Sequence, residues 1–153
     1  MVASGSGTKI EELAHHLFDV VSRFCLVAPR GRRRAGELKE IEFLTLSLLH
    51  QREMLIVGDI QRQLGVLPAQ MSRIIRSLET RERPLIACRI NSQDKRKIDV
   101  ALTPAGAVAL QEYQNARVAG IARLVGGLAE EDLDELHRLV AQLQDRAGAA
   151  AVS

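Results

Sequence analysis

Several features that define whole classes of protein are missing from this chain of 153 residues. It contains no run of about 18 apolar residues, so we expect no membrane-spanning helix. Residues 1–9 are rich in glycine and serine and hold no apolar stretch behind basic residues, so we expect no signal peptide and a cytoplasmic location. Hydrophobic residues still make up 46% of the chain, enough for the core of one domain with helical extensions.

Cysteine and aromatic residues are scarce. Cys25 and Cys88 lie far apart and outside any CxxC pattern, which excludes a disulfide framework and a zinc site and fits a reducing compartment. Aromatic residues make up only 3%, which argues against stacking platforms for single-stranded nucleic acid. The sequence also lacks a nucleophile–base–acid arrangement, a glycine-rich phosphate loop and metal-ligand spacing among its histidines. We therefore expect neither an enzyme nor a metal or other cofactor.

Basic charge is concentrated in the middle of the chain, although the net charge is only +2. Between Arg62 and Lys97, nine basic residues stand against three acidic ones, whereas between Thr103 and Arg146 four stand against seven. This distribution is typical of a chain with one phosphate-facing surface. Chance clustering on a solvated face gives the same counts, so charge alone does not decide between the two.

Apolar residues recur at helical spacing in six segments. Local signals mark their ends: Thr8 and Glu11 form a capping box, Gly65 ends a helix, and Thr103 followed by Pro104 starts one. Short tails at either end of the chain are expected to be flexible, at residues 1–7 and 147–153. The predicted helices cover residues 9–27, 37–51, 58–64, 68–82, 104–125 and 130–146.

Two further runs, residues 85–90 and 97–102, alternate apolar and polar residues as strands do. The polar segment 91–96 between them predicts a β-hairpin with a long basic tip, and residues 54–57 fit a brief edge strand. The apolar side chains that the alternation assigns to one face are Ile86, Cys88, Ile90, Ile98, Val100 and Leu102.

Three helices followed by a hairpin is the order of a winged helix-turn-helix. The tight turn 65–67 contains glycine, as this motif requires. The helix 68–82 turns Arg73 and Arg76 outward, where each can donate two hydrogen bonds to guanine, and Gln70 can pair with adenine. The basic tip of the hairpin can reach an adjacent minor groove or the backbone. The expected fold is mainly α with a small β-hairpin wing (α+β).

The same region resembles the MarR family of bacterial winged helix-turn-helix transcriptional regulators. The resemblance covers about residues 37–106. The pieces that carry it are Ile60-x-x-x-Leu-Gly-Val66, Pro68-x-x-Met-Ser-Arg73 with Ser77-Leu-Glu79, Asp94-Lys-Arg96 and Leu102-Thr-Pro-Ala-Gly106. The last two match the family's wing signature, Asp-x-Arg followed by Leu-Thr-x-x-Gly, in the expected register.

The resemblance implies a homodimer held together by helices within residues 8–28 and 104–146, with two DNA-binding lobes, each formed by residues 37–103, on a pseudo-palindromic operator. It also implies that Arg96 enters the minor groove and that Asp94 orients Arg96 by a salt bridge. The residues expected to contact DNA are Pro68, Ala69, Gln70, Ser72, Arg73, Arg76, Ser77, Arg89, Asp94, Lys95, Arg96 and Lys97.

Two departures from the family's pattern stand out. Leu67 occupies the position before the helix proline where family members usually carry serine or threonine, and this loses a side-chain cap worth about 1 kcal/mol. Residues 80–86 contain no glycine, where the family usually has Glu-x-x-Gly-Leu-Val. The turn into the wing must therefore differ.

Three groups of residues each keep two interpretations. Cys25 is either an oxidant sensor, as in some family members, or a small buried hydrophobic residue. Phe18, Phe43 and His50 either line a cleft for a small aromatic effector, as the family often has, or belong to the ordinary core. The basic run 30–34 either contacts phosphates or is an exposed linker.

The sequence therefore predicts a homodimeric regulator, expected to be a repressor, that binds double-stranded DNA sequence-specifically. It predicts no catalysis and no membrane partner, with a small-molecule effector as an open question. The alternative is a winged-helix adaptor that assembles proteins without binding DNA. The basic outer face of helix 68–82 and the basic hairpin tip favour DNA.

Overall fold

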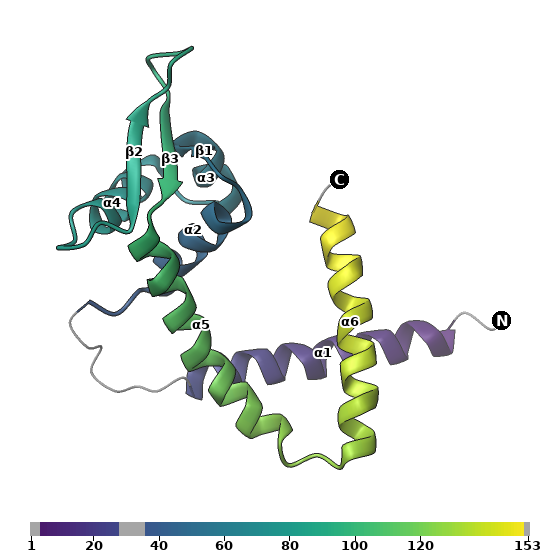
Figure 1. The fold of residues 1–153 in the computed structure, drawn as a ribbon. Coiled ribbons are helices and arrows are strands. Elements are labelled where there is room, and N and C mark those ends of the chain that lie inside the picture. The colour runs from purple at the N-terminus through teal and green to yellow at the C-terminus, as the bar shows by residue number, and fades with distance from the viewer. Residues whose placement is uncertain (1–3, 28–35, 152–153) are drawn as a thin grey trace. The chain divides into compact units, whose positions relative to one another are not determined.

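The computed structural model describes residues 4–27 and 36–151, with the side chains of residues 7–24 and 36–150. The chain divides after Tyr113 into two compact units, which are described separately. Within the described residues, none of the helices is long and apolar enough to cross a membrane. In chain order (Figure 1) the elements are α1 (Ser4–Val27), α2 (Glu40–Gln51), β1 (Leu55–Ile56), α3 (Val57–Leu64), α4 (Pro68–Glu79), β2 (Ile86–Ile90), β3 (Ile98–Leu102), α5 (Pro104–Val125) and α6 (Glu130–Ala151).

Residues 36–113 form a lobe around a single apolar core. α4 buries Met71, Ile74 and Leu78 along one face, because these positions recur at the spacing of a helical turn. The other elements of the lobe add side chains to the same cluster, and α5 contributes Leu110. The mainly helical fold with a small sheet is confirmed. The largest fully buried apolar side chains are Leu46, Leu49, Ile60, Met71, Leu78, Ile86 and Val100.

The sheet has three antiparallel strands in the order β1-β3-β2. The brief edge strand expected near residues 54–57 is confirmed as β1, which pairs with β3 at Leu55 and Val100. Only the base of the β2–β3 hairpin covers the core. Ile90, paired with Ile98 near the tip, is 71% exposed. Ile90 and Ile98 share one face of the hairpin, as the alternation predicts, but this end of the face is exposed, because the strands continue beyond the helices that they pack against (Figure 1).

The turn from α4 into β2 closes without glycine. The Leu85 N–H donates to the carbonyl of Leu78 at 3.0 Å, so the chain reverses directly after α4. α4 ends at Glu79 rather than at residue 82 as predicted. Among the described residues, a positive φ occurs at glycines alone. This turn therefore needs no left-handed residue, which explains how the sequence manages without the family's usual glycine.

Thr103 fastens the exit of the wing to the same turn. Its hydroxyl donates to the Pro84 carbonyl at 2.6 Å and accepts the Gly106 N–H at 3.0 Å, while its own N–H donates to the Leu85 carbonyl at 3.1 Å. The predicted cap at Thr103 is thus confirmed. A β-carbon at Gly106 would overlap the Leu85 carbonyl oxygen, so glycine is required for α5 to begin this close to the turn.

Several predicted helix ends are wrong by a few residues. α1 begins at Ser4, so Thr8 lies inside the helix and its expected role as a cap is wrong. Residues 4–7 and 147–151, expected in flexible tails, belong to α1 and α6. α2 begins at Glu40 rather than residue 37. A capping pattern in the sequence does not distinguish the start of a helix from its interior when the preceding residues can also adopt a helical conformation.

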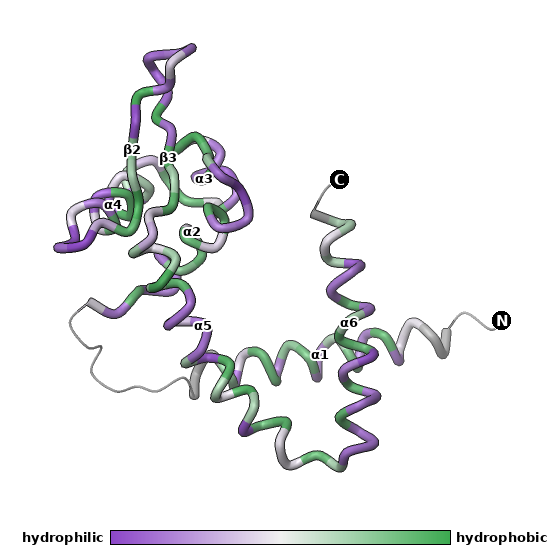
Figure 2. Tube along the Cα trace, in the orientation of Figure 1, coloured by the Kyte–Doolittle hydropathy of each residue, from purple (hydrophilic) through white to green (hydrophobic). Residues whose placement is uncertain are grey.

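The second unit holds the end of α5 and the whole of α6. α6 starts with Glu130, Glu131 and Asp132, whose charges suit the positive end of the helix dipole. Apolar and polar residues alternate along α6 and along α1 (Figure 2). Each of these helices therefore has an apolar face of its own.

Candidate nucleic-acid interface

The outer face of α4 presents most of the residues predicted there to contact DNA. Within the described part of the chain, Arg73 and Arg76 have no side-chain hydrogen bond or ion pair, so all their guanidinium donors are available. Leu67, the residue before α4, makes no side-chain cap and is 74% exposed. The exposed predicted residues on this helix are Pro68, Ala69, Gln70, Ser72, Arg73 and Arg76.

Ser77 does not share this outer face. Its side chain is half-buried, and its hydroxyl donates to the carboxylate of Glu42 at 3.0 Å. The hydroxyl of Ser77, which was expected to contact DNA, is therefore engaged by a carboxylate within the lobe. Ser77 lies three residues after Ile74 and one before Leu78, which places it at the edge of the buried stripe of the helix.

Asn91 and Asp94 build the tip of the wing from side-chain hydrogen bonds. The Asn91 Oδ1 accepts the N–H groups of Gln93 and Asp94, both at 2.9 Å, in an Asx turn. The Asn91 Nδ2 donates to Asp99 Oδ1 at 2.8 Å. The main chain closes the tip from Asn91 N–H to the Lys97 carbonyl at 2.9 Å. The tip therefore has a defined shape before any ligand arrives.

The Arg96 side chain, 90% exposed, is held by Asp94. Its Nε lies 3.1 Å from Asp94 Oδ1 and its Nη2 lies 3.4 Å from Oδ2, so the guanidinium faces the carboxylate with two donors. The hydrogen bonds from Arg96 hold the pKa of Asp94 below its usual range. The salt bridge that the resemblance implied is thus present, and Arg96 projects into solvent with its orientation set.

A hollow lies where the wing meets the start of α3. It is lined on one side by Gly58, Asp59 and Arg62 and on the other by Arg96 and Lys97. Arg62 also pairs with Asp59 on the same helix. Arg62 was not among the residues expected to contact DNA, because the helical spacing of α3 indicates only its inward residues. Three basic side chains therefore meet at this hollow. The other predicted wing residues, Arg89 and Lys95, are exposed.

The residues suggested for an effector site do not share a described contact. Phe43 stacks on Tyr113 with ring centroids 4.4 Å apart and packs against the core of the lobe. His50 is exposed near the end of α2, and Phe18 is exposed on α1. An effector site at these residues remains a prediction.

No observation on the described residues supports a functional role for Cys25 or Cys88. The side chain of Cys25 lies outside the described residues, as does the basic run 30–34. Cys88 is half-buried beside the core, and burial, with a smaller effect of Glu79, raises the pKa of its thiol. A raised pKa disfavours the reactive thiolate. The described residues contain no group of three or more acidic, histidine or cysteine side chains placed to hold a metal ion.

Comparison with known proteins shows which family this sequence matches. The model of the MarR family matches residues 38–98, which run from the start of α2 into the wing. The expected resemblance to the MarR family is therefore confirmed over these residues. MarR-family proteins are transcriptional regulators rather than enzymes, and their winged helix binds DNA.

Individual MarR-family relatives match much of the chain. The HTH-type transcriptional repressor MdtR of Bacillus subtilis (strain 168) is 29% identical over 106 residues, which are 69% of this chain and 67% of MdtR. The crystal structure of the YusO protein from Bacillus subtilis matches with a TM-score of 0.65 and 25% identity, covering 95% of this chain and 99% of that one. A mutant of MepR from S. aureus, bound to an oligodeoxyribonucleotide, matches in fold with a TM-score of 0.61, 22% identity, and coverage of 88% and 97%.

Proposed function

We propose that this MarR-family chain is a homodimeric repressor that reads a pseudo-palindromic operator with two winged lobes. The observation that carries the proposal is that the lobe presents two kinds of arginine. Those on α4 have no side-chain partner within the described chain, whereas the arginine on the wing is held in one orientation. Arg73 and Arg76 keep their donors free, and Arg96 is held outward by Asp94. This combination suits base reading in a major groove by a helix and insertion into a neighbouring minor groove by the wing.

The apolar faces of the flanking helices support the dimer. The exposed apolar residues of α1 recur at helical spacing, as do those of α6, so each helix carries an apolar stripe suited to packing against another helix. A second copy that packs against these stripes would supply the second lobe that an operator with two inverted half-sites requires. The exposed residues of these stripes are Ile10, Leu13, Leu17, Val20 and Val21 on α1 and Leu136, Leu139, Val140 and Leu143 on α6.

The relatives support both the repressor role and DNA as the ligand. MdtR is named a transcriptional repressor, and the MepR mutant was crystallised with an oligodeoxyribonucleotide. A dimer that covers an operator with both lobes blocks access of the transcription machinery to the same duplex. The cytoplasmic location expected from the sequence belongs to this proposal, since the bacterial chromosome lies there.

The decisive experiment selects bound fragments from sheared genomic DNA with the purified protein and sequences them. We expect enrichment of a site with two inverted half-sites, a dimer by light scattering, and affinity that falls steeply with salt as counterions are released. A reporter gene under that site should be silenced when the protein is present. If no duplex is bound at low salt and a second protein co-purifies instead, the adaptor alternative is correct.

A further inference from the structure

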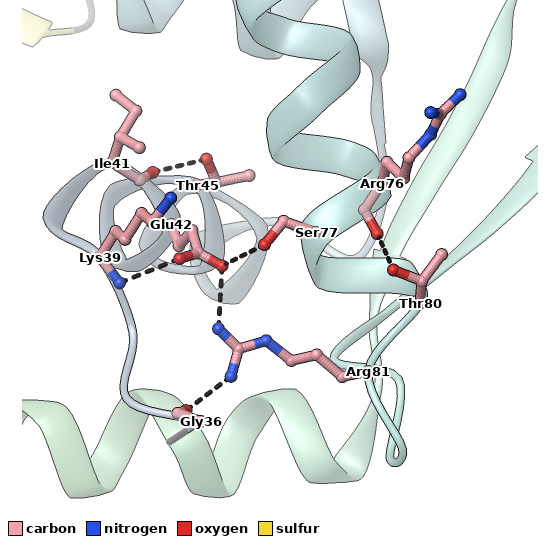
Figure 3. Close-up of polar contacts among 9 residues, drawn as sticks. All are labelled: Gly36, Lys39, Ile41, Glu42, Thr45, Arg76, Ser77, Thr80 and Arg81. Carbon is pink, nitrogen blue, oxygen red and sulfur yellow. Dashed lines mark hydrogen bonds and ion pairs between the residues drawn. The ribbon is translucent and has the colours of Figure 1, made fainter. Parts of the chain in front are cut away.

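A buried carboxylate joins α2 to the end of α4 (Figure 3). The Glu42 side chain is only 2% exposed. Its Oε1 accepts the Lys39 N–H at 3.0 Å, and its Oε2 accepts the Ser77 hydroxyl at 3.0 Å and Arg81 Nη2 at 2.9 Å. Burial alone raises the pKa of the Glu42 carboxyl, but these hydrogen bonds outweigh it, and the pKa lies below its ordinary value. Glu42 is therefore a paired anion inside the lobe.

The same Arg81 reaches a third segment. Its Nη1 donates to the Gly36 carbonyl at 2.6 Å, across 45 positions of sequence. Gly36 has a φ of +95°, which favours glycine, and lies just before α2, which begins at Glu40. One guanidinium thus ties together the segment that enters the lobe, α2 and the end of α4. Arginine suits this role better than lysine, because its guanidinium presents a separate nitrogen to each acceptor, whereas the donors of lysine share a single nitrogen.

This ion pair is poorly suited to stabilising the fold. The Arg81 Nε is buried and finds no acceptor among the described residues. Glu42 is buried while the Arg81 side chain is 21% exposed, so the cost of desolvating the carboxylate offsets much of the charge attraction within the pair. Such pairs can instead select one arrangement of the parts that they join. The geometry therefore points away from a purely stabilising role.

We propose that Arg81 is a positioning residue for DNA recognition. This role rests on the proposed function. Arg81 fixes the last turn of α4 against α2 and against the segment at Gly36. Ser77 follows Arg76 directly and Arg81 lies just beyond the end of α4 at Glu79, so the angle at which α4 presents its free arginines depends on the contacts of these two residues with Glu42. Without the pair, α4 keeps its apolar packing but its last turn loses its fixed position.

The test compares Arg81→Met with Arg83→Met, an exposed arginine two residues further along the same turn. Each variant is titrated, over a range of salt concentrations, with a duplex selected by the wild-type protein and with a random duplex of equal length. We expect Arg81→Met to weaken binding to the selected duplex about tenfold, with random-duplex affinity and the salt slope unchanged. Arg83→Met should not show this selective loss of affinity for the selected duplex.

The double variant Glu42→Gln/Arg81→Met separates positioning from stability. It leaves no unpaired buried charge, so we expect its melting temperature to return toward the wild-type value while the selected-duplex affinity stays low. Arg81→Lys provides the same comparison if Arg81→Met does not fold.

Two results would overturn the inference. If selected-duplex affinity recovers together with the melting temperature, Arg81 acts only on stability. If Arg81→Met weakens both duplexes equally and lowers the salt slope by about one, Arg81 contacts a phosphate directly. A wild-type protein that binds no duplex would instead overturn the proposed function.

Discussion

The two parts of the lobe that we propose to contact DNA, the outer face of α4 and the tip of the wing, are built in opposite ways. The arginines of α4 stand on a rigid helix but have no side-chain partners in the described chain. Arg96 stands on a hairpin, far from the core, but is oriented by Asp94, and the turn beneath it is formed by Asn91. In α4 the backbone is fixed and the side chains are free, whereas in the wing side chains fix the backbone.

The difference assigns different tasks to the two parts. A long side chain that becomes ordered on binding loses about 0.5–1.5 kcal/mol of entropy, and Arg73 and Arg76 must bear this cost. In return, they can settle on whichever base edges match, which suits sequence reading. Arg96 is ordered beforehand and suits a contact whose shape varies little between sites, such as a narrow minor groove.

Removing the support that both parts share should have the largest effect. Gly106→Ala places a methyl group against the Leu85 carbonyl, at the junction between the α4–β2 turn and the start of α5. We expect the free energy of unfolding to fall by about 3 kcal/mol, because a well-packed junction accommodates an extra carbon poorly. Chemical denaturation measures this loss, and Gly58→Ala, where a β-carbon meets nothing within 4 Å, is the matched control. Equal stability of the two variants would show that the junction is loose.

Removing one free arginine from α4 comes next. Arg73→Ala or Arg76→Ala should weaken operator binding by about 1–3 kcal/mol and relax the preference at one base position, since a bidentate contact to guanine is lost. Binding to a library with each operator position varied measures both effects. Loss that is uniform over all positions would assign these arginines to phosphates instead.

Breaking the orientation of the wing arginine should have a smaller effect. Asp94→Asn keeps the Asx turn beneath Arg96 but removes the anionic partner of its guanidinium, so we expect binding to weaken about fivefold and evenly across sequences. Lys95→Met, which removes a neighbouring charge without touching the pair, is the control. A change in base preference on Asp94→Asn would contradict the division of tasks.

The same pair should also respond to pH in a defined direction. Because hydrogen bonds from Arg96 lower the pKa of Asp94, the pair is fully formed above the ordinary carboxyl pKa and is lost only as the pH falls through the lowered one. An NMR titration of the Asp94 carboxyl should therefore have its midpoint below that of an unpaired aspartate. In Arg96→Ala the midpoint should rise, and an unchanged midpoint would show that the pair does not persist in solution.

Restoring the missing cap should have the smallest effect. Leu67→Ser supplies a hydroxyl to the open N–H groups of α4 where the leucine makes no cap and is exposed. We expect a gain of roughly 0.5–1 kcal/mol in the free energy of unfolding, visible as a higher melting temperature. Leu67→Ala should give no such gain, because alanine cannot cap.

The sequence predicted what depends on local spacing and missed what depends on tertiary contacts. The stripe at Met71, Ile74 and Leu78 and the cap at Thr103 were recoverable, because each is set by neighbours a few positions away. Ser77 was misplaced because its partner, Glu42, lies 35 positions earlier in the sequence. No local sequence pattern predicts that a glutamate such as Glu42 will be buried within a helix. The direction of its hydroxyl partner, Ser77, therefore cannot be predicted from local spacing either.

The wing shows the same division. The Asp94–Arg96 pair was expected from the family's signature, since the two residues are neighbours in sequence. The part played by Asn91 was missed, although its position at the start of a polar turn is a recognised signal for an Asx turn. The contacts of Arg81 were beyond reach, because Gly36 and Glu42 approach it only once the lobe has folded.

The fastening of Thr103 to Pro84 and Leu85 also makes the preceding turn a suitable place for a reporter. Both anchored carbonyls lie at the end of the turn, and Leu85 is bonded back to Leu78, so the root of the wing is held without help from Glu82 or Arg83. These two residues are exposed. Lengthening an exposed loop adds little closure entropy. A short tetracysteine tag for a fluorescent dye, inserted between Glu82 and Arg83, would therefore label the lobe at the end of α4 while leaving the wing in place.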